Sequence, residues 1–536
     1  MLNKKVKCML IQPKFSNNSF WNYTEVCKLT GAKYPAAPLG LLTVAALLPQ
    51  SWEFKLIDEN VSDIKDEELD WADIILTGGM LPQQTSILRI IDIAKEMRKP
   101  VVVGGPDPSS QPDIYGKADF LVLGEAEVTI EAFLNDLSRN RESGVYFPDR
   151  KSDMEKSVIP RYDLIDFRNY LHIGIQYSRG CPYNCEFCDI IEMLGRKPRA
   201  KTCKQIVSEL NSLYNLGYRG HIDFVDDNFI GNKCKVMEVL DEIAKWSKEH
   251  DYPFYFSTEA SINLAKEEKL LELMEKSDFR YVFIGIESPD NEVLEKAQKK
   301  QNVEVSVKDA VRILSSHGMV VNGGFILGFD NESSNIADNM IDLIQDSGIC
   351  MAMVGTLYAL PNTQLTRRLR KEGRLFNNSL KIEDSSVDID QITSGLNFIT
   401  SRSRINIIND HIDILKKIYD PVMYYKRIYK TALNIKPTYK NKPGFLKLMK
   451  LALGFLRVCT SIGLNRKTRL LYWNTLLKVI LKNPKAVEVS VNLAAMYLHF
   501  SKQNNFVIKS LHEKIETIKM HGEEKYNQLM LNGLKT

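Results

Sequence analysis

Three cysteines within eight residues constrain this chain more than any other feature. Cys181, Cys185 and Cys188 are spaced C-x3-C-x2-C and follow an apolar run, residues 172–177, that predicts a short buried strand. Thiolates grouped on a loop after a strand can bind a soft metal or one corner of an iron–sulfur cluster. Because a fully ligated 4Fe–4S cluster takes four cysteines, three of them leave one iron open to a non-protein ligand.

Two other interpretations of these cysteines stay open. One is a zinc site with Cys203 as the fourth ligand, although zinc sites usually show paired C-x2-C knuckles. The other is a group of three unrelated buried thiols, which the tight spacing argues against. We therefore favour the iron–sulfur cluster.

The spacing, with the aromatic Phe187 just before the third cysteine, resembles the signature of the radical S-adenosylmethionine (SAM) enzymes. In that family the open iron chelates the amino and carboxylate groups of SAM. The resemblance implies that Cys181, Cys185 and Cys188 bind a 4Fe–4S cluster and that Phe187 is one of the residues around SAM.

Residues 1–140 alternate strand-like and helix-like segments, which predicts an α/β fold with a doubly wound, Rossmann-like parallel sheet. Strands are expected at 7–12, 53–58, 73–77, 101–103 and 120–123, with helices at 38–48, 85–97 and 127–137. Small residues and one acid follow the last three strands, at the edge where such sheets bind ligands. They are Gly78, Gly79, Gly104, Gly105, Gly124 and Glu125. For any one of these glycines taken alone, a tight strand–helix turn is the better explanation.

This layout resembles the cobalamin-binding domain that precedes the radical SAM core in one large subclass. The matching stretches are residues 34–41, 103–106 and 123–127, so the resemblance implies that the glycines and Glu125 contact cobalamin. The D-x-H-x-x-G motif that supplies an axial histidine in other cobalamin proteins is absent, and residues 1–171 contain no histidine. No imidazole from this domain can therefore ligate the cobalt.

After a polar linker at 141–168, residues 169–375 again repeat strands and helices. Six strands are expected, at 172–177, 221–225, 254–257, 281–286, 320–327 and 351–357, each followed by polar residues. This pattern predicts an open (β/α)6 partial TIM barrel, whose chemistry lies at the carboxyl ends of the strands.

The resemblance assigns SAM-binding roles to residues at those strand ends. The set comprises Phe187, Asp226, Asp227, Asn228, Ser257, Glu259, Glu287, Leu357 and Leu360. The acids supply acceptors for an ammonium group, and the leucines would pack on adenine. Each acid alone could instead be a helix N-cap, while His221 at a strand start is expected to be structural.

Residues 376–420 are expected to form a connector whose segment 395–398 folds back over the active face in related proteins. A basic, mainly helical region follows at 421–536, which holds 21 of the 71 Lys and Arg but only 5 of the 67 Asp and Glu. Its amphipathic helices suit either peripheral contact with an anionic membrane or a helical cap docked on the acidic body. Nucleic acid is a weaker interpretation, because no recognised nucleic-acid module accompanies the charge.

The whole chain resembles cobalamin-dependent radical SAM enzymes of the hopanoid lipid C-methylase type. The resemblance implies cleavage of SAM to a 5′-deoxyadenosyl radical, hydrogen abstraction from an unactivated carbon and methyl transfer through methylcobalamin. The substrate would be a small molecule, with a lipid suggested by the basic tail, and a donor such as flavodoxin or ferredoxin would supply the electron. The alternatives are radical coupling, cyclisation or rearrangement without methyl transfer, or a non-catalytic metal- or cluster-binding protein.

The nine cysteines of this chain suit a reducing compartment better than a disulfide framework. The N-terminal residues lack the long apolar core of a signal peptide, and no stretch offers 18 uncharged apolar residues. A cytoplasmic location is therefore expected, with peripheral contact at the inner membrane face left open as an option.

Overall fold

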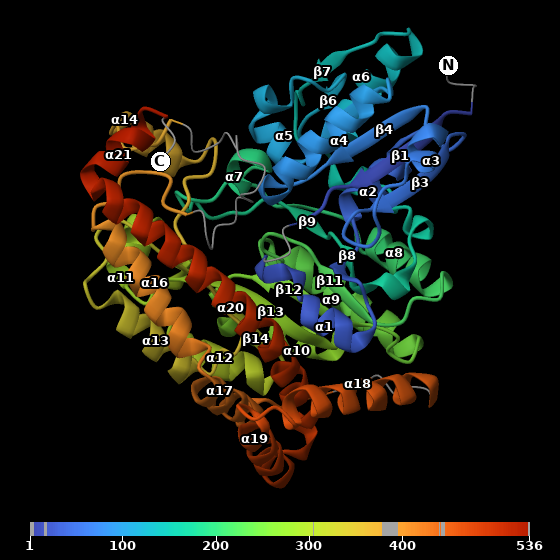
Figure 1. Ribbon diagram of the computed structural model, residues 1–536. Helices are drawn as coiled ribbons and strands as arrows, with labels where there is room; N and C mark the ends of the chain where they lie inside the picture. Colours follow the sequence, from blue (N-terminus) through green and yellow to red (C-terminus); the bar gives the residue numbers. More distant parts are fainter. Residues whose placement is uncertain are drawn as a thin grey trace.

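The computed structural model describes residues 5–15, 19–303, 305–377, 395–438, 440 and 445–533. It contains two parallel sheets that meet in the middle of the molecule and a helical region at the C-terminal end of the chain (Figure 1). The expected α/β architecture, with a doubly wound sheet and a partial barrel, is confirmed.

The first sheet has six parallel strands in the order β3-β1-β4-β5-β6-β7. Successive side chains of its strands enter two separate cores, as a sheet covered on both faces requires. Met9 packs with α4 on one face, whereas Leu10 packs with α2 and α6 on the other. The strands are β1 (Lys7–Gln12), β3 (Glu53–Asp58), β4 (Ile74–Gly78), β5 (Val101–Gly104), β6 (Phe120–Val122) and β7 (Gly144–Tyr146), and the helices are α2 (Leu39–Leu47), α3 (Asp66–Trp71), α4 (Gln84–Glu96), α5 (Pro106–Ser110) and α6 (Ala126–Ser138).

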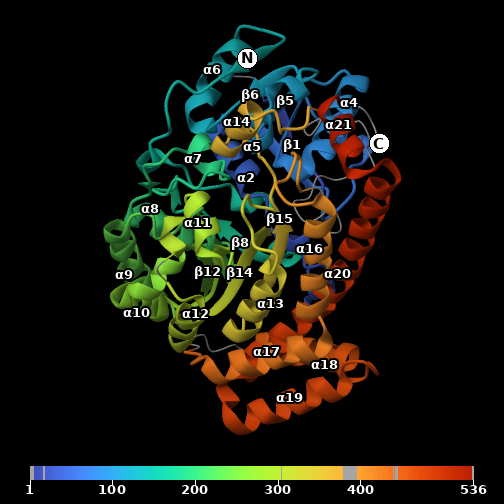
Figure 2. The same cartoon turned by 90° about the vertical axis from the view of Figure 1, so that its left-hand side faces the viewer.

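The second sheet is a curled, all-parallel sheet of seven strands in the order β15-β14-β13-β12-β11-β8-β2. Helices cover its outer, convex face (Figure 2). The side chains on that face are buried, and those that alternate with them line the concave face of the half-barrel. The strands are β8 (Tyr170–Ile175), β11 (His221–Phe224), β12 (Tyr255–Ala260), β13 (Phe279–Glu287), β14 (Val320–Leu327) and β15 (Ala352–Thr356), covered by α8 (Cys203–Asn215), α9 (Lys233–Glu249), α10 (Glu268–Ser277), α12 (Val307–Ser316) and α13 (Ile336–Ser347). These six strands are the ones expected from the sequence.

The seventh strand, β2 (Tyr34–Ala36), comes from the N-terminal region and was not expected. It pairs in parallel with β8, with Tyr34 opposite Tyr170 and Ala36 opposite His172. The residues before the half-barrel therefore contribute an edge strand to it. Similarly, β7 lies within the stretch 141–168 that was expected to be a linker.

The C-terminal helices share a continuous hydrophobic core with the half-barrel. They are α16 (Arg404–Ile418), α17 (Pro421–Asn434), α18 (Phe445–Gly463), α19 (Arg469–Lys482), α20 (Val487–His521) and α21 (Glu523–Leu531). The long helix α20 runs beside α16 and the short α1 (Thr24–Thr30), while α17, α18 and α19 form the end of the molecule farthest from the first sheet (Figures 1 and 2). Within the residues that the structure describes, no helix is both long and apolar enough to cross a membrane.

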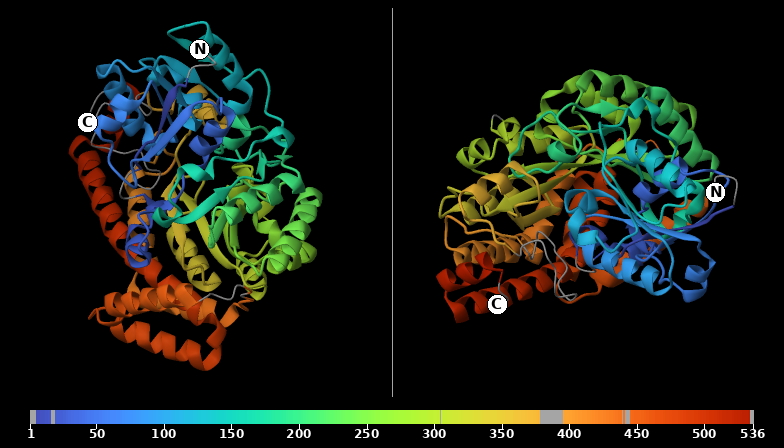
Figure 3. Two further views of the ribbon diagram at one scale, coloured as in Figure 1. Left: turned by 90° about the vertical axis from the view of Figure 1, so that its right-hand side faces the viewer. Right: turned by 90° about the horizontal axis from the view of Figure 1, so that it is seen from above.

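The carboxyl ends of the two sheets face each other. The Asn362 side chain, beyond β15, donates a hydrogen bond to the carbonyl of Ser110 at the end of α5, with 3.1 Å between nitrogen and oxygen. The views from the side and from above show the first sheet placed over this end of the half-barrel (Figure 3). Any group bound at one edge is therefore presented to the other.

Candidate active site

The three cysteines of the motif lie on the loop that follows β8, at the carboxyl end of the half-barrel. Two side-chain amides approach them: Asn228 lies 3.9 Å from the Cys181 sulfur and Gln301 lies 3.6 Å from the Cys185 sulfur. Burial raises the pKa of the Cys188 thiol to about 12, and the nearby ammonium group of Lys299 opposes that increase. Bound iron would deprotonate such thiols outright.

Two other segments hold the loop in place. Glu186 forms an ion pair of 2.8 Å with Arg368 of α14 (Gln364–Lys371), and its carbonyl accepts from the backbone N–H of Leu365 at 2.8 Å. Asn184 accepts a hydrogen bond from Gln364 at 3.0 Å and donates one to Gln298, which follows α11 (Asn291–Lys296). The loop therefore has a fixed backbone before any cofactor binds.

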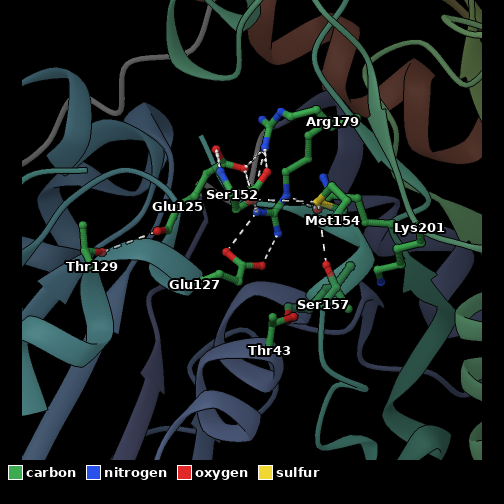
Figure 4. A network of polar contacts seen from close by, with 12 residues as sticks. Thr43, Glu125, Glu127, Thr129, Ser152, Met154, Ser157, Arg179 and Lys201 are labelled. Atoms are coloured by element: carbon green, nitrogen blue, oxygen red, sulfur yellow. Dashed lines mark hydrogen bonds and ion pairs between the residues drawn. The ribbon is translucent and has the colours of Figure 1, made fainter. Parts of the chain in front are cut away.

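Arg179, two residues before Cys181, ties the loop to the first domain (Figure 4). Its guanidinium group pairs with Glu125 at 3.0 Å and with Glu127 at 2.8 Å. Glu125 also pairs with Arg199 at 2.9 Å and accepts from the Ser152 hydroxyl at 2.6 Å. Burial alone would raise the pKa of Glu125, but Arg199, Ser152 and Arg179 together lower it to about 2. The carboxylate predicted to face cobalamin thus holds the cysteine loop.

Arg179 and Arg199 also belong to a two-stranded antiparallel pair on either side of the cysteine loop. This pair consists of β9 (Ser178–Arg179) and β10 (Arg199–Ala200), with the short α7 (Ile190–Met193) between them. It brings both guanidinium groups to Glu125.

The zinc alternative is not supported by the position of Cys203. This thiol lies at the start of α8, where burial and then Glu238 and Glu242 of α9 raise its pKa. In the part of the chain that the structure describes, no three His, Cys, Asp or Glu side chains converge on one metal ion. A multi-iron cluster, which is larger than a single ion, suits three thiols on one loop better.

Asp226 and Asp227, both predicted to bind SAM, have different surroundings. Asp226 is buried and accepts hydrogen bonds from the backbone N–H of Tyr177 at 3.0 Å and from the Ser178 hydroxyl at 2.6 Å. Burial raises the pKa of Asp226 to about 7, against the effect of these donors. One carboxylate oxygen of Asp227 is buried and has no hydrogen-bond partner among the described residues, and burial raises the pKa of Asp227 to about 6.

Asn228 and Glu259 complete this part of the rim. The Asn228 side chain accepts from the backbone N–H of Ser261 at 3.2 Å and directs its amide group at Cys181. Glu259 is exposed on the concave face, and its carboxylate makes no hydrogen bond within the described residues. Although solvent reaches this side chain, the surrounding concave wall removes much of the water around its carboxylate, and this desolvation, followed by the neighbouring carboxylates of Asp223 and Asp227, raises its pKa to about 8. A cationic ligand would relieve this repulsion.

Ser257 lies deeper on the concave face than the other predicted SAM residues. Its hydroxyl group donates to Asp223 and lies 2.7 Å from the Nε2 atom of His221. The rings of His221 and His172 are 5.2 Å apart, and burial lowers the pKa of both histidines, so both are neutral. His221, expected to be structural, belongs to this polar chain.

Glu287 ends β13 with a left-handed backbone, φ +67°, beside a register shift in the sheet. Its carboxylate pairs with Lys299 at 2.7 Å and folds over Gly285, where a Cβ atom would lie 2.4 Å from a carboxylate oxygen of Glu287. Asn302 donates to the carbonyls of Gly285 and Ile286 at 2.9 and 3.0 Å. Such conformations persist where the surroundings fix them, often at functional sites.

The predicted apolar contacts lie on the same rim. The Phe187 ring is 5.6 Å from that of Phe329, just beyond β14, and 5.9 Å from the Lys299 nitrogen. Leu357 is buried and Leu360 is partly exposed. As expected, the segment 395–398 folds back here, because the backbone N–H of Leu396 donates to the Leu357 carbonyl at 2.7 Å.

The glycines of the first sheet allow close packing of its strand ends. A Cβ atom on Gly78 would lie 2.2 Å from the Gly104 carbonyl oxygen, and one on Gly104 would lie 2.7 Å from the Val122 carbonyl oxygen. Gly105 and Gly124 have left-handed backbones, at φ +97° and +71°, and Gly79 abuts the Gln83 side chain. Tight packing therefore accounts for these glycines whether or not they also contact a cofactor.

Several residues of the site could not be predicted from the sequence. Lys299 immediately precedes the short 3-10 helix Lys300–Asn302, and Gln301 lies within it. No motif marks this segment, and only folding brings the two side chains to the thiols. Asp223, in contrast, could have been predicted from the sequence. It is an acidic residue within the strand β11, and the alternation of side chains along a strand places it on the concave face of the sheet.

Comparison with known proteins matches three parts of the chain to families. Residues 29–134 match the B12 binding domain, residues 175–344 match the radical SAM superfamily, and residues 363–513 match a domain of unknown function (DUF4070). The fold and the cysteine loop thus define a radical SAM enzyme preceded by a B12-binding domain.

Proteins of similar sequence identify the family within the radical SAM enzymes. An uncharacterized methyltransferase of Synechocystis sp. is 38% identical over 95% of this chain and 94% of its own length. The hopanoid C-2 methylase of Rhodopseudomonas palustris is 38% identical over 66% of this chain and 67% of its own length. The chain belongs to the family of cobalamin-dependent radical SAM methyltransferases.

Solved structures agree at the level of the fold. The cobalamin-dependent radical SAM enzyme OxsB, with aqua-cobalamin bound, has a TM-score of 0.59 at 17% identity and covers 96% of this chain and 81% of its own. The methyltransferase TsrM of Kitasatospora setae, with cobalamin and a [4Fe-4S] cluster bound, has a TM-score of 0.57 at 14% identity over 90% of this chain and 100% of its own.

The family implies a 4Fe–4S cluster, SAM and cobalamin as cofactors, and the residues present suit the first two. Three thiols lie on one fixed loop, and beside them Asp227 and Glu259 form no ion pair with the described residues. Cobalamin binding within residues 29–134 follows from the matched domain, without an imidazole ligand from residues 1–171.

Proposed function

We propose that this enzyme methylates an unactivated carbon of a small-molecule substrate, and that the substrate is a lipid. The chemical steps supplied by the bound cofactors are reductive cleavage of SAM, hydrogen abstraction and methyl donation. The polypeptide holds the cofactors, orients the substrate between the two facing sheet edges and excludes water. A one-electron donor such as flavodoxin or ferredoxin would reduce the cluster.

In this proposal Cys181, Cys185 and Cys188 ligate three irons of the cluster. Asp227 and Glu259 accept hydrogen bonds from the ammonium group of SAM and offset its positive charge, with Asn228 beside them. Phe187, Glu287, Leu357 and Leu360 surround the nucleoside. Asp226 and Ser257 act through other residues, because the cysteine loop and His221 already occupy their polar atoms.

At the edge of the first sheet, the proposal keeps Gly78, Gly79, Gly104, Gly105 and Gly124 as the surface that cobalamin approaches. Glu125 becomes a positioning residue, because its carboxylate is occupied by Arg179 and Arg199.

The observation that carries the proposal is the position of two acceptors beside the cysteine loop, at the end of the half-barrel facing the B12-binding domain: the Glu259 carboxylate and one oxygen of Asp227, neither of which has a hydrogen-bond partner among the described residues. The lipid as substrate class rests on the similarity to the hopanoid C-2 methylase. Peripheral membrane contact is a separate proposal, because it involves other residues.

The test is an anaerobic assay of the full chain with reconstituted cluster, hydroxocobalamin, SAM and dithionite. We expect 5′-deoxyadenosine, together with retained corrinoid absorbance. In the presence of a hopanoid acceptor, mass spectrometry should show a product heavier by one CH2 group.

The Cys185→Ala variant is compared with Cys234→Ala as its matched control, because Cys234 is an exposed thiol on α9 that does not belong to the three-cysteine motif. Only the first variant should lose SAM cleavage. Cleavage with a product of unchanged carbon count would favour coupling or cyclisation instead. Absence of cleavage by a reduced, iron-replete protein would contradict the proposal.

A further inference from the structure

Exposed apolar side chains gather on α18 and α19. Of the 22 large hydrophobic residues that are exposed in the described part of the chain, eleven lie between residues 448 and 481. These eleven define the α18–α19 surface: Leu448, Met449, Leu453, Phe455, Leu456, Leu464, Leu470, Trp473, Leu477, Ile480 and Leu481. Apolar patches of this kind mark contact sites with proteins or membranes.

On α19 the exposed residues form one stripe along the helix. Leu470, Trp473, Leu477 and Ile480 recur at intervals of three and four, which places them on one face. The opposite face, with Tyr472, Leu476 and Val479, is buried against the rest of the molecule. The stripe is therefore not the part of α19 that holds the fold together, and Leu481 beside it is 82% exposed.

On α18 the buried residues Val458 and Ile462 belong to the core shared with the half-barrel. Leu453 and Leu456 of the same helix are more than half exposed, at 51% and 57%. The Trp473 indole donates to the Gly463 carbonyl at 3.0 Å, which joins the end of α18 to α19. The two helices lie at the end of the molecule away from the first sheet (Figures 1 and 2). Their exposed apolar residues therefore belong to that end.

The charge around this surface has a single sign. Residues 421–487 contain 15 Lys and Arg and no Asp or Glu. Arg466, Lys467, Arg469, Lys478 and Lys482 are all exposed and flank the apolar stripe. Lysine and arginine near an anionic bilayer contribute favourable energy, while leucine and tryptophan enter the boundary between headgroups and acyl chains.

We propose that the α18–α19 surface docks the enzyme on an anionic membrane. A second copy of the chain would place these cations against each other, because the surface contains no acids to pair with them. Nucleic acid would meet the cations but would leave the exposed leucines in water. An anionic bilayer complements both the charge and the apolar side chains. This inference does not depend on which molecule is methylated.

The experiment is flotation of the full chain with vesicles of phosphatidylcholine alone or mixed with phosphatidylglycerol. We expect flotation with the anionic vesicles, weakened by salt, and little with the neutral ones. The double variant Leu477→Glu and Leu481→Glu should weaken binding by more than about tenfold, because it puts two charges into the apolar stripe.

The matched control is Leu216→Glu with Met520→Glu, which makes the same charge change at exposed apolar residues outside the surface. It should bind as the unaltered chain does. Circular dichroism and SAM cleavage should be unchanged in both variants, so loss of binding cannot be ascribed to unfolding.

Fluorescence gives a second readout. Brominated acyl chains should quench part of the tryptophan emission of the unaltered chain, and Trp473→Phe should remove that quenching. Failure to float with anionic vesicles at low salt would overturn the proposal. The proposal would also be overturned if the unaltered chain formed a dimer that the double variant Leu477→Glu and Leu481→Glu cannot form. The α18–α19 surface would then bind a second copy of the chain.

Discussion

Asp226 and Asp227 are neighbours in the chain, yet the turn after β11 gives them different environments. Asp226 points into the protein and fixes the start of the cysteine loop through Tyr177 and Ser178. Asp227 keeps one oxygen without a partner within the described residues. A buried acceptor without a donor costs free energy, so a ligand that supplies the donor gains binding energy there.

Replacement of Asp227 should therefore weaken SAM binding selectively. For Asp227→Asn we expect a SAM KM raised about tenfold to a hundredfold, since hydrogen bonds to charged groups contribute about 1.5–3 kcal/mol. The measurement is 5′-deoxyadenosine formation against SAM concentration. Asp226→Asn should instead lower thermal stability and iron content. Equal SAM KM values in Asp227→Asn and the unaltered chain would remove Asp227 from the SAM site.

At the residue scale, the sequence indicated which positions reach the rim but not how each is used. The cysteines and the strand-end acids follow from spacing and from strand periodicity. Whether Asp226 or Asp227 fixes the cysteine loop depends on which backbone N–H groups lie near each carboxylate, and the sequence does not show this. Lys299 could not be predicted, because no motif marks the segment that brings it to Glu287 and Phe187.

The long helix α20 carries Lys514, whose positive charge destabilises the folded protein at neutral pH. The ammonium group of Lys514 donates to the Gly395 carbonyl at 3.2 Å. Burial, and then the guanidinium of Arg404, lower its pKa to about 7, against about 10.4 in an unfolded chain. Between these values the unfolded state binds more protons, so the stability of the protein rises with pH from 7 to about 10.

Lys514→Met should therefore stabilise the protein at neutral pH. We expect a gain of more than about 1 kcal/mol at pH 7, because one pKa unit corresponds to about 1.4 kcal/mol. The gain should shrink as pH rises from 7 toward about 10.4, because the lysine of the unaltered chain is already neutral in the folded state and loses its proton in the unfolded state only above that pH. Thermal unfolding at pH 7 and pH 9.5 measures it, and Lys519→Met, an exposed position on α20, should change little. A gain independent of pH would show that packing, not charge, is responsible.

At the element scale, alternation and glycine placement predicted eleven strands, all of which the structure contains. The two additional strands of the sheets lacked those signals. β2 has three residues with Pro35 at its centre, a residue that strand patterns usually exclude except at edges. β7 also has three residues and lies in a polar stretch, and its pairing with β6 is set by the folded domain.

At the scale of the whole molecule, the ion pairs of Glu125 and Glu127 join the B12-binding domain to the cysteine loop. The substitution Glu125→Gln removes the buried negative charge with which both Arg179 and Arg199 form ion pairs. We expect a loss of about 1–3 kcal/mol in stability and less iron per chain after reconstitution. Because the pKa of Glu125 is lowered in the folded state, its contribution is present above about pH 4.5 and fades below it.

The matched control for Glu125→Gln is Glu131→Gln on the exposed side of α6. Iron content and thermal unfolding at pH 7 should distinguish the two. Unchanged iron content in Glu125→Gln would mean that α14 and the segment around Gln301 suffice to hold the loop.

The strand β2 limits how this enzyme can exchange its small molecules. The chain leaves the first sheet after β1, enters the half-barrel sheet as β2 and returns to the first sheet at β3, so β2 adds two chain crossings between the domains. A hinge that swung the B12-binding domain away would have to bend the chain on both sides of β2 and break the Arg179 ion pairs. We therefore expect SAM, its products and the methylated molecule to pass sideways between the domains, with local loop movement rather than domain opening.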